Sequence, residues 1–206
     1  MIEVNSPVFW DKQYKNGNDR WNLNNAVPVF VQLLEEEKFI TPSKLLILGS
    51  GKGYEAIFAA KKGYEVSAID FSSEAINFSK NLAKDNNVKI NFLQEDFFDL
   101  ASLHPGEFDY IFEYVSICAV QPEKRKELLE NIHAALKPGG RFISLLFPLN
   151  ERRGGPPFSI NLPEFYTMAK SIFKPSYFSR VIPSIKPRKN NEVLLIFTKG
   201  SNGKKS

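Results

Sequence analysis

The stretch Leu45–Glu55, LLILGSGKGYE, decides the fold class of this chain. Four apolar residues, the pattern of a buried strand, run into Gly49, Gly51 and Gly53, and glycines let a backbone turn tightly and approach a ligand closely. A phosphate-binding P-loop requires Gly-x-x-x-x-Gly-Lys-Ser/Thr, and this motif is absent because a glycine follows Lys52. The dinucleotide fingerprint Gly-x-Gly-x-x-Gly is disfavoured, because the third glycine comes one position early.

Short apolar runs alternate with segments of helical period from about residue 44 onward. This alternation is typical of a parallel sheet with helices on its faces. Ser73 is expected to cap one helix, and Pro122 is expected to open another, which Lys137–Gly140 ends. We therefore predict an α/β fold with a mostly parallel, doubly wound sheet and helices on both faces. The expected strands cover residues 44–48, 65–69, 89–94, 108–113, 141–147, 176–182 and 192–198.

Two acids follow the second and third expected strands, Asp70 and Asp96. In a βαβ unit an acid at the position of Asp70 can accept hydrogen bonds from both ribose hydroxyls of an adenosine, although capping of the next helix is a simpler alternative. Asp96 suits an adenine amino group, with Phe97 packed beside the ring; alternatively, the aromatic residues there belong to the core. Together with the glycine loop, these acids favour an adenosine-containing ligand.

Composition and charge exclude several classes of protein. Hydrophobic residues make up 43% and charged residues 24% of the 206 residues, which is ordinary for one soluble globular domain. The net charge of +4 comes partly from Lys186–Lys189 and Lys199–Ser206, which we interpret as solvated segments and not as a nucleic-acid face. The chain shows neither a signal-peptide pattern nor an apolar run of about 18 residues. We expect a cytoplasmic monomer that binds neither nucleic acid nor membrane.

Residues with reactive side chains are few. The single cysteine, Cys118, excludes an internal disulfide and a multi-cysteine metal site, and we interpret it as a small buried hydrophobe and not as a nucleophile. The two histidines, His104 and His133, are expected to be structural, so no general base is predicted. Tyr166–Lys170 matches the Tyr-x-x-x-Lys pattern of short-chain dehydrogenases, but the glycine spacing of those enzymes differs, and we interpret the match as chance. We expect neither a bound metal nor a catalytic side chain.

With this glycine loop and these acids, the chain resembles class I S-adenosyl-L-methionine-dependent methyltransferases, and Phe108–Tyr114 and Leu136–Phe142 extend the resemblance. That resemblance implies a Rossmann-like sheet of seven strands. Many members of the superfamily have an acid two residues before the first glycine, where this chain has Ile47. An apolar residue at this position is common in the thiopurine methyltransferase-like branch, which includes halide and thiol methyltransferases.

Two further motifs resemble that branch more specifically. Phe9–Tyr14, followed by Arg20 and Trp21, matches its aromatic N-terminal run, and Gly154–Phe158 matches its Gly-Gly-Pro-Pro-aromatic loop. Together the resemblance covers about residues 9 to 199. Since the first forty residues differ in composition from the rest, we expect an N-terminal cap segment over residues 1–40 within the same domain, a methyltransferase domain over residues 41–199 and a flexible tail over residues 200–206.

The resemblance implies S-adenosyl-L-methionine as the cofactor, with the N-terminal aromatic residues closing over it. Aromatic faces attract a sulfonium cation, which has no proton to donate in a hydrogen bond. Tyr14 departs from some relatives, which have a second tryptophan there. The implied cofactor contacts are Trp10, Tyr14, Trp21, Gly49, Ser50, Gly51, Asp70, Phe71, Asp96, Phe97 and Tyr114, and the implied substrate contacts are Trp10, Tyr14, Pro156 and Phe158.

The implied reaction is methyl transfer by direct displacement to a small soft nucleophile, which is a thiol, hydrosulfide, a halide or a thiopurine. Such an anion requires alignment and desolvation, and no base, so the shortage of histidines agrees with it. Two alternatives stay open at this point, a nicotinamide-dependent oxidoreductase and a non-catalytic module that keeps the fold. Lys52 has no assigned role and is expected to be solvated.

Overall fold

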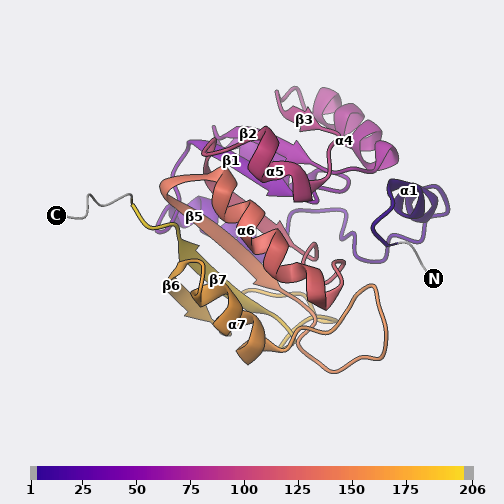
Figure 1. Ribbon diagram of the computed structural model, residues 1–206. Coiled ribbons are helices and arrows are strands. Elements are labelled where there is room, and N and C mark those ends of the chain that lie inside the picture. The colour runs from indigo at the N-terminus through magenta and orange to yellow at the C-terminus, as the bar shows by residue number, and fades with distance from the viewer. Residues whose placement is uncertain (1–3, 202–206) are drawn as a thin grey trace. The chain divides into compact units, whose positions relative to one another are not determined.

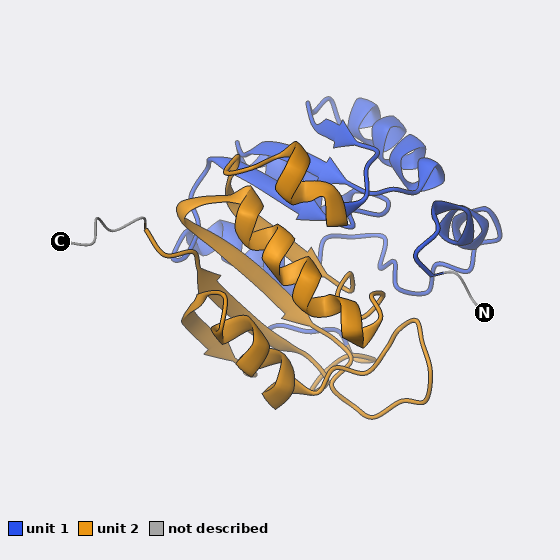
Figure 2. Cartoon of the chain, viewed as in Figure 1, with its two compact units in different colours: residues 1–97, 183–185 blue, residues 98–182, 186–206 orange. Residues whose placement is uncertain are grey.

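The computed structural model describes residues 4–201, which gather into two compact units (Figures 1 and 2). The N-terminal unit comprises the residues up to Phe97 together with Pro183–Ile185, and the C-terminal unit comprises Phe98–Ile182 and the residues from Lys186 onward. The domain boundaries at residues 40 and 199 stay a prediction. Most of the expected tail, residues 202–206, lies outside the described residues.

The N-terminal unit contains parallel strands in the order β3-β2-β1. Helix α3 packs on β2, and α4 lies beside α1, α3 and β3. The strand β1 is buried almost completely, as a parallel strand covered on both faces should be. The bounds of these elements are α1 Pro7–Lys15, α2 Pro28–Glu36, β1 Lys44–Leu48, α3 Tyr54–Lys61, β2 Glu65–Ile69, α4 Ser73–Asp85 and β3 Asn91–Leu93.

The C-terminal unit contains both parallel and antiparallel strand pairs. Strand β4 pairs in parallel with β5, whereas β7 runs antiparallel to both β5 and β6. Helix α6 packs on β5 and lies beside α5 and α7 (Figure 1). The 3-10 turn η1 Phe97–Asp99 begins at the last residue of the N-terminal unit. The bounds that follow are α5 Leu100–Leu103, β4 Phe108–Tyr114, η2 Pro122–Lys124, α6 Arg125–Ala135, β5 Leu136–Leu146, α7 Leu162–Lys170, β6 Lys174–Ser179 and β7 Val193–Thr198, where η marks a 3-10 turn.

The strand order of the described chain is β3-β2-β1-β4-β5-β7-β6. The expected α/β class with a mostly parallel sheet of seven strands is thereby confirmed. Within the range of residues 4–201, no helix is both long enough and apolar enough to cross a bilayer.

Several expected boundaries were wrong, each for a local reason. The cap of α4 is Ser72 and not Ser73, because the Ser72 hydroxyl accepts the hydrogen bond from the Ala75 amide at 3.2 Å. Pro122 opens a 3-10 turn, and α6 itself begins at Arg125. Strand β5 begins at residue 136 and not 141, because its first residues pair with β4 across a register shift. Strand β6 covers 174–179 and not 176–182, and Val181 beyond it is 94% exposed.

Candidate cofactor and substrate site

Each of the three glycines in the loop between β1 and α3 adopts a backbone conformation that favours glycine. Gly49, Gly51 and Gly53 have φ angles of 57°, 51° and 82°, in the left-handed region that side chains disfavour. A Cβ atom at Gly53 would lie 1.9 Å from the Ser79 hydroxyl of α4. The third glycine, which is misplaced for a dinucleotide fingerprint, therefore allows the start of α3 to pack closely against α4.

Asp70, at the end of β2, is a buried acid that is tied to this loop. Its Oδ2 accepts the Gly51 amide hydrogen bond at 2.9 Å, and its Oδ1 accepts the Ser72 amide hydrogen bond at 2.9 Å. Burial raises the pKa of Asp70 to about 6 and Asp11 adds to this effect, although the two amide hydrogen bonds oppose it. Because a carboxylate has about four acceptor positions, each oxygen can accept a further hydrogen bond, as a ribose diol would require.

Phe71 and Phe97 form a pair of facing rings near this acid in the N-terminal unit. Their centroids lie 6.4 Å apart and their planes differ by 24°. Nearly parallel aromatic rings of this kind offer faces on which a flat heterocycle can pack. Asp96, the residue before Phe97, is half-buried.

The residues from 9 to 21, which we call the aromatic segment, place three expected cofactor contacts together. The Trp21 ring packs edge-on against Trp10 and Tyr14, with centroid distances of 5.3 and 5.6 Å. The Trp21 Nε1 group donates a hydrogen bond to the Tyr14 hydroxyl at 3.4 Å. A Cβ atom at Gly51 would lie 3.0 Å from that hydroxyl, so Tyr14 lies against the glycine loop. Burial, and next the charge of Asp70, raise the pKa of Tyr14.

Polar contacts that the sequence did not predict attach the aromatic segment to two loops. The Asp11 carboxylate accepts hydrogen bonds from the Ser72 hydroxyl at 2.6 Å and from the Glu74 amide at 3.2 Å. The Lys52 Nζ atom lies 2.8 Å from Asp19 Oδ2, and the Lys52 side chain is only 21% exposed. The expectation that Lys52 is solvated was therefore wrong, because it forms an ion pair.

In the C-terminal unit, the half-buried Tyr114 and Phe147 form a cluster with the buried Arg188 and Glu192. The Tyr114 hydroxyl donates a hydrogen bond to Glu192 Oε1 at 2.7 Å and accepts one from the Arg188 guanidinium. The guanidinium also lies 4.9 Å from the ring centroids of Tyr114 and Phe147. Arg188 is only 5% exposed, so its interpretation as part of a solvated basic segment was wrong. Cation–π contacts and the hydroxyl compensate its desolvation.

Glu113, the residue before Tyr114, is a further buried acid and was not predicted as a site residue. It accepts hydrogen bonds from the Ser144 hydroxyl and from the Ile117 amide, the latter at 3.2 Å. Burial raises its pKa to about 7, and these hydrogen bonds oppose the rise. The turn that it holds includes Val115 at φ 61°, a rare conformation for a β-branched residue.

Cys118 follows that turn and is buried, as expected. Its thiol donates a hydrogen bond to the Val115 carbonyl at 3.1 Å, and burial, followed by the charge of Glu113, raises its pKa to about 12. A thiol with this pKa is protonated at neutral pH and is a poor nucleophile. The Cys118 carbonyl accepts the Phe158 amide hydrogen bond at 2.7 Å, which fixes one end of the loop after β5.

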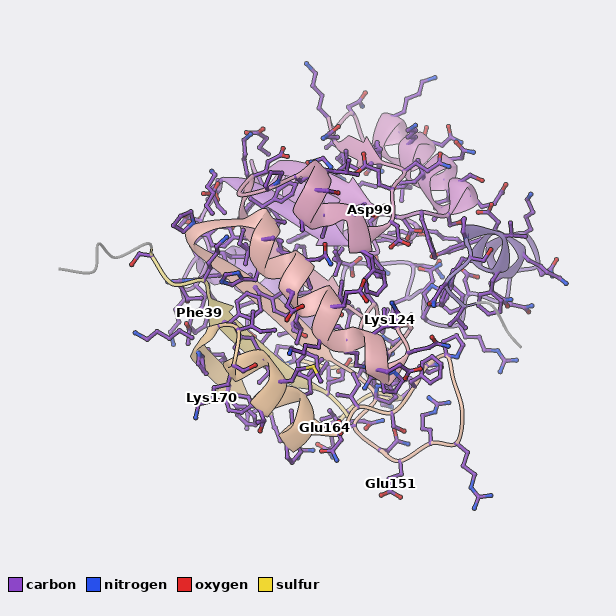
Figure 3. The ribbon with its side chains drawn as sticks, in the orientation of Figure 1. Phe39, Asp99, Lys124, Glu151, Glu164 and Lys170 are labelled. Atoms are coloured by element: carbon purple, nitrogen blue, oxygen red, sulfur yellow. The ribbon has the colours of Figure 1, made fainter. Side chains whose placement is uncertain are left out.

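The loop between β5 and α7 carries the expected substrate contacts Pro156 and Phe158, both half-buried. A Cβ atom at Gly155 would lie 2.4 Å from the Phe158 ring, so the ring packs directly on the glycine backbone. Glu151 lies on the outer part of this loop and points away from the ribbon (Figure 3). The half-buried proline and aromatic residues thus follow an exposed polar part of the loop.

The remaining reactive residues have structural contacts. His104 Nδ1 lies 2.8 Å from Glu107 Oε2, and the His133 ring packs edge-on against Phe173. The Tyr166 ring contacts two phenylalanine rings of the C-terminal unit, which agrees with interpreting its match to dehydrogenases as chance. Within residues 4–201, no group of three or more His, Cys, Asp or Glu is arranged to hold a metal ion. The contact roles expected for individual site residues stay predictions.

The chain is similar to known proteins over most of its length. Residues 5–196 match the family model described as thiopurine S-methyltransferase (TPMT). Probable thiol methyltransferase 2 of Arabidopsis thaliana is 34% identical over 168 residues, which cover 80% of this chain and 73% of that protein. Thiocyanate methyltransferase 1 of Brassica oleracea is 29% identical, with 90% and 82% covered. Thiopurine S-methyltransferase of Vibrio atlanticus (strain LGP32) is 24% identical, with 76% and 78% covered.

Two solved structures share the fold at lower identity. One, from work on the conversion of a disulfide bond into a thioacetal group during echinomycin biosynthesis, has a TM-score of 0.80 at 16% identity, with 96% and 94% of the two chains covered. The other is Burkholderia thailandensis 1,6-didemethyltoxoflavin-N1-methyltransferase with bound S-adenosylhomocysteine, at a TM-score of 0.72 and 21% identity, with 95% and 87% covered. The family match extends over nearly the whole chain, and the chain therefore belongs to the thiopurine S-methyltransferase family of S-adenosyl-L-methionine-dependent methyltransferases.

Proposed function

We propose that this S-adenosyl-L-methionine-dependent methyltransferase transfers its methyl group by direct displacement to a small soft anion, such as hydrosulfide, thiocyanate or a halide. The observation that carries the proposal is the arrangement of the N-terminal unit, where Asp70 is tied to the glycine loop and Phe71 faces Phe97. These groups suit an adenosine, and the family membership makes the oxidoreductase and non-catalytic alternatives unnecessary.

The residues of the N-terminal unit fit the cofactor in three respects. Asp70 offers acceptor positions for a ribose diol, Phe71 and Phe97 would hold the adenine, and the Tyr14 hydroxyl lies at Gly51. S-adenosyl-L-methionine supplies an electrophilic methyl group on a sulfonium cation. The aromatic segment provides rings whose faces stabilise such a cation by about 0.5 to 2 kcal/mol each, depending on exposure. The proposed contacts also include Trp10, Trp21, Gly49, Ser50, Asp96 and Tyr114.

An anionic nucleophile is favoured because the acid–base groups of the C-terminal unit are engaged elsewhere. Both carboxylate oxygens of Glu113 accept hydrogen bonds from the protein, and the thiol of Cys118 is protonated. An anion such as hydrosulfide attacks without losing a proton in the transition state. Its reaction then depends on alignment and on removal of water, to which Pro156 and Phe158 would contribute.

Similarity to a thiol and a thiocyanate methyltransferase, at 34% and 29% identity, supports a small sulfur anion as the substrate.

We further propose that the protein is a cytoplasmic monomer. The single cysteine is buried and needs no oxidising compartment, and the proposal predicts that light scattering after gel filtration gives the mass of one chain. Addition of duplex DNA should leave the elution volume unchanged.

Headspace gas chromatography tests the proposed substrate class. The protein is incubated with S-adenosyl-L-methionine and, separately, with iodide, bromide, chloride, hydrosulfide or thiocyanate, while a thiopurine is assayed in parallel. We expect methyl iodide, methanethiol or methyl thiocyanate to form faster than any methylated thiopurine. Methylated thiopurine as the sole product would instead assign the chain to an aromatic thiol substrate and contradict the anion proposal.

A further inference from the structure

From the contacts of the aromatic segment, we infer that Asp11, Asp19 and Lys52 are positioning residues that set how long the cofactor stays bound. They hold the aromatic segment against two loops of the N-terminal unit, the glycine loop and the turn after β2. The inference rests on the proposed function, because it requires these loops to hold the cofactor. The side chains themselves are not expected to contact the reacting atoms.

The first attachment joins α1 to the start of α4. Asp11 Oδ1 accepts hydrogen bonds from the Ser72 hydroxyl at 2.6 Å and the Glu74 amide at 3.2 Å, while Oδ2 accepts one from the Ser73 hydroxyl at 3.1 Å. The first amides of a helix have no partner within the helix, and a carboxylate there also interacts favourably with the helix dipole. Asp11 thus caps α4 from another helix, which docks α1 at this position. Burial opposes ionisation, but the three hydrogen bonds hold the pKa of Asp11 below its ordinary value.

The second attachment joins the end of the aromatic segment to the glycine loop. Lys52 lies between two loop glycines, and its Nζ atom is 2.8 Å from Asp19 Oδ2. The two side chains are only 21% and 11% exposed, so the ion pair is shielded from water. Asp19 is itself held by the Asn22 amide group at 3.0 Å, and the Lys52 ammonium lies 4.8 Å from the Phe78 ring centroid.

Polar contacts position α1 together with the half-buried rings of Trp10 and Tyr14. None of its residues is fully buried, so the hydrophobic effect alone positions this helix weakly. In a further ion pair, between Lys15 and Glu74, the two side chains are 61% and 35% exposed respectively, so this pair should contribute little to the position of α1. Tyr14 lies three residues after Asp11 on the same face of α1. Fixing Asp11 therefore also places the Tyr14 hydroxyl at the glycine loop.

The attachment is continuous with the proposed ribose acceptor. Ser72 donates its hydroxyl hydrogen bond to Asp11 and its amide hydrogen bond to Asp70, and Asp70 in turn accepts the Gly51 amide. Loss of the Asp11 carboxylate would remove the acceptor of the Ser72 hydroxyl at the turn that orients Asp70. The position of the aromatic segment and the geometry of the cofactor loop are thereby coupled.

The test compares Asp11→Ala and Lys52→Met with Lys15→Met, which removes the exposed ion pair of the same helix. Dissociation of S-adenosylhomocysteine is followed by stopped flow, and acrylamide quenching reports on Trp10 and Trp21, the two tryptophans of the chain. We expect the first two variants to release S-adenosylhomocysteine about tenfold faster, to show more accessible tryptophans and to raise the KM for S-adenosyl-L-methionine more than they lower kcat. Lys15→Met should match the wild type.

Asp11→Asn serves as the conservative variant. Its amide oxygen can still accept the Ser72 and Glu74 hydrogen bonds, and its amino group can donate to the Ser73 hydroxyl. We therefore expect this variant to release S-adenosylhomocysteine at close to the wild-type rate. Release rates within twofold of the wild type in both Asp11→Ala and Lys52→Met would overturn the inference. If Asp11→Ala fails to fold, the release rate of S-adenosylhomocysteine from Lys52→Met alone decides whether the inference holds. A wild-type protein that does not bind S-adenosylhomocysteine would instead refute the proposed function.

Discussion

Asp70 is a buried carboxyl group whose protonation should govern cofactor binding. Burial raises its pKa to about 6, and only the ionised form can accept two ribose hydrogen bonds. As the pH falls below 6, the carboxyl becomes protonated and binding must first remove that proton. We therefore expect the affinity for S-adenosylhomocysteine to fall about tenfold per pH unit below 6 and to be constant above about 7, as measured by titration calorimetry.

The variant Asp70→Asn separates this titration from other effects of pH. It lacks the charge at every pH, so it should bind S-adenosylhomocysteine about 10- to 100-fold more weakly at pH 7.5, since a hydrogen bond to a charged group contributes about 1.5 to 3 kcal/mol. Its affinity should not change between pH 5 and 7. Equal pH profiles for the variant and the wild type would show that Asp70 does not bind the ribose.

Single residues differ in how far the sequence predicts them. The spacing of Gly49, Gly51 and Asp70 indicated the loop that the structure contains, because backbone geometry ties these positions to strand ends. The predicted environments of Lys52 and Arg188 were wrong, since the burial of each side chain depends on a partner that is distant in the sequence. Burial of a cation depends on acceptors and rings elsewhere in the chain, and no local pattern reports them.

The loop between β5 and α7 is the element whose shape should control the substrate. Gly155 lies directly under the Phe158 ring, and a Cβ atom there would overlap the ring at 2.4 Å. The substitution Gly155→Ala must therefore displace Phe158. We expect kcat/KM for the nucleophile to fall at least tenfold, while the affinity for S-adenosylhomocysteine changes less than twofold, as measured by headspace kinetics and calorimetry.

Gly154→Ala is the matched substitution in the same loop. A Cβ atom at Gly154 would meet no atom within 4 Å, but its φ of 71° makes alanine unfavourable by about 1 kcal/mol. This variant should lose stability with a smaller loss of kcat/KM than Gly155→Ala. If Gly155→Ala keeps full kcat/KM, the proposed contact between Phe158 and the substrate is incorrect.

Whole elements were predicted better than their ends. The apolar runs that became β1, β2, β4 and β7 have boundaries within one residue of those expected, because their burial is continuous along the chain. The predicted N-cap of α4 was one residue too late, since two adjacent serines are equally suitable as caps by sequence alone. Their roles differ only because the Ser72 hydroxyl reaches Ala75, which depends on how the preceding turn approaches the helix.

At the scale of the whole molecule, the amino-acid sequence predicted which segments form strands and the fold class. It did not predict the polar contacts that join distant segments. Asp11 meets Ser72 over 61 residues, and Tyr114 meets Glu192 over 78 residues. The partners in such pairs lie far apart in the sequence, so no local pattern indicates them. The candidate site was predicted as a glycine loop, aromatic residues and the acids Asp70 and Asp96, and the structure adds the contacts of Asp11 and Asp19.

The pH dependence of global stability provides a last prediction, carried by Glu113. Burial raises its pKa from 4.5 to about 7 in the folded protein, so the folded state binds this proton more tightly than the unfolded state does. The resulting stabilisation is fully present below about pH 4.5 and is lost as the pH rises through 7. At about 1.36 kcal/mol per pKa unit, it amounts to about 3 kcal/mol.

Urea unfolding of the wild type and of Glu113→Gln between pH 4.5 and 8 measures this contribution. The variant cannot titrate at this position, and the contribution of Asp70 cancels because both proteins contain it. We expect the free energy of unfolding of the wild type to fall relative to that of the variant by up to about 3 kcal/mol as the pH rises over this range. A difference that stays constant with pH would mean that the buried Glu113 carboxyl has the same pKa in the folded and unfolded states, and that the turn after β4 is held by a permanently charged acid.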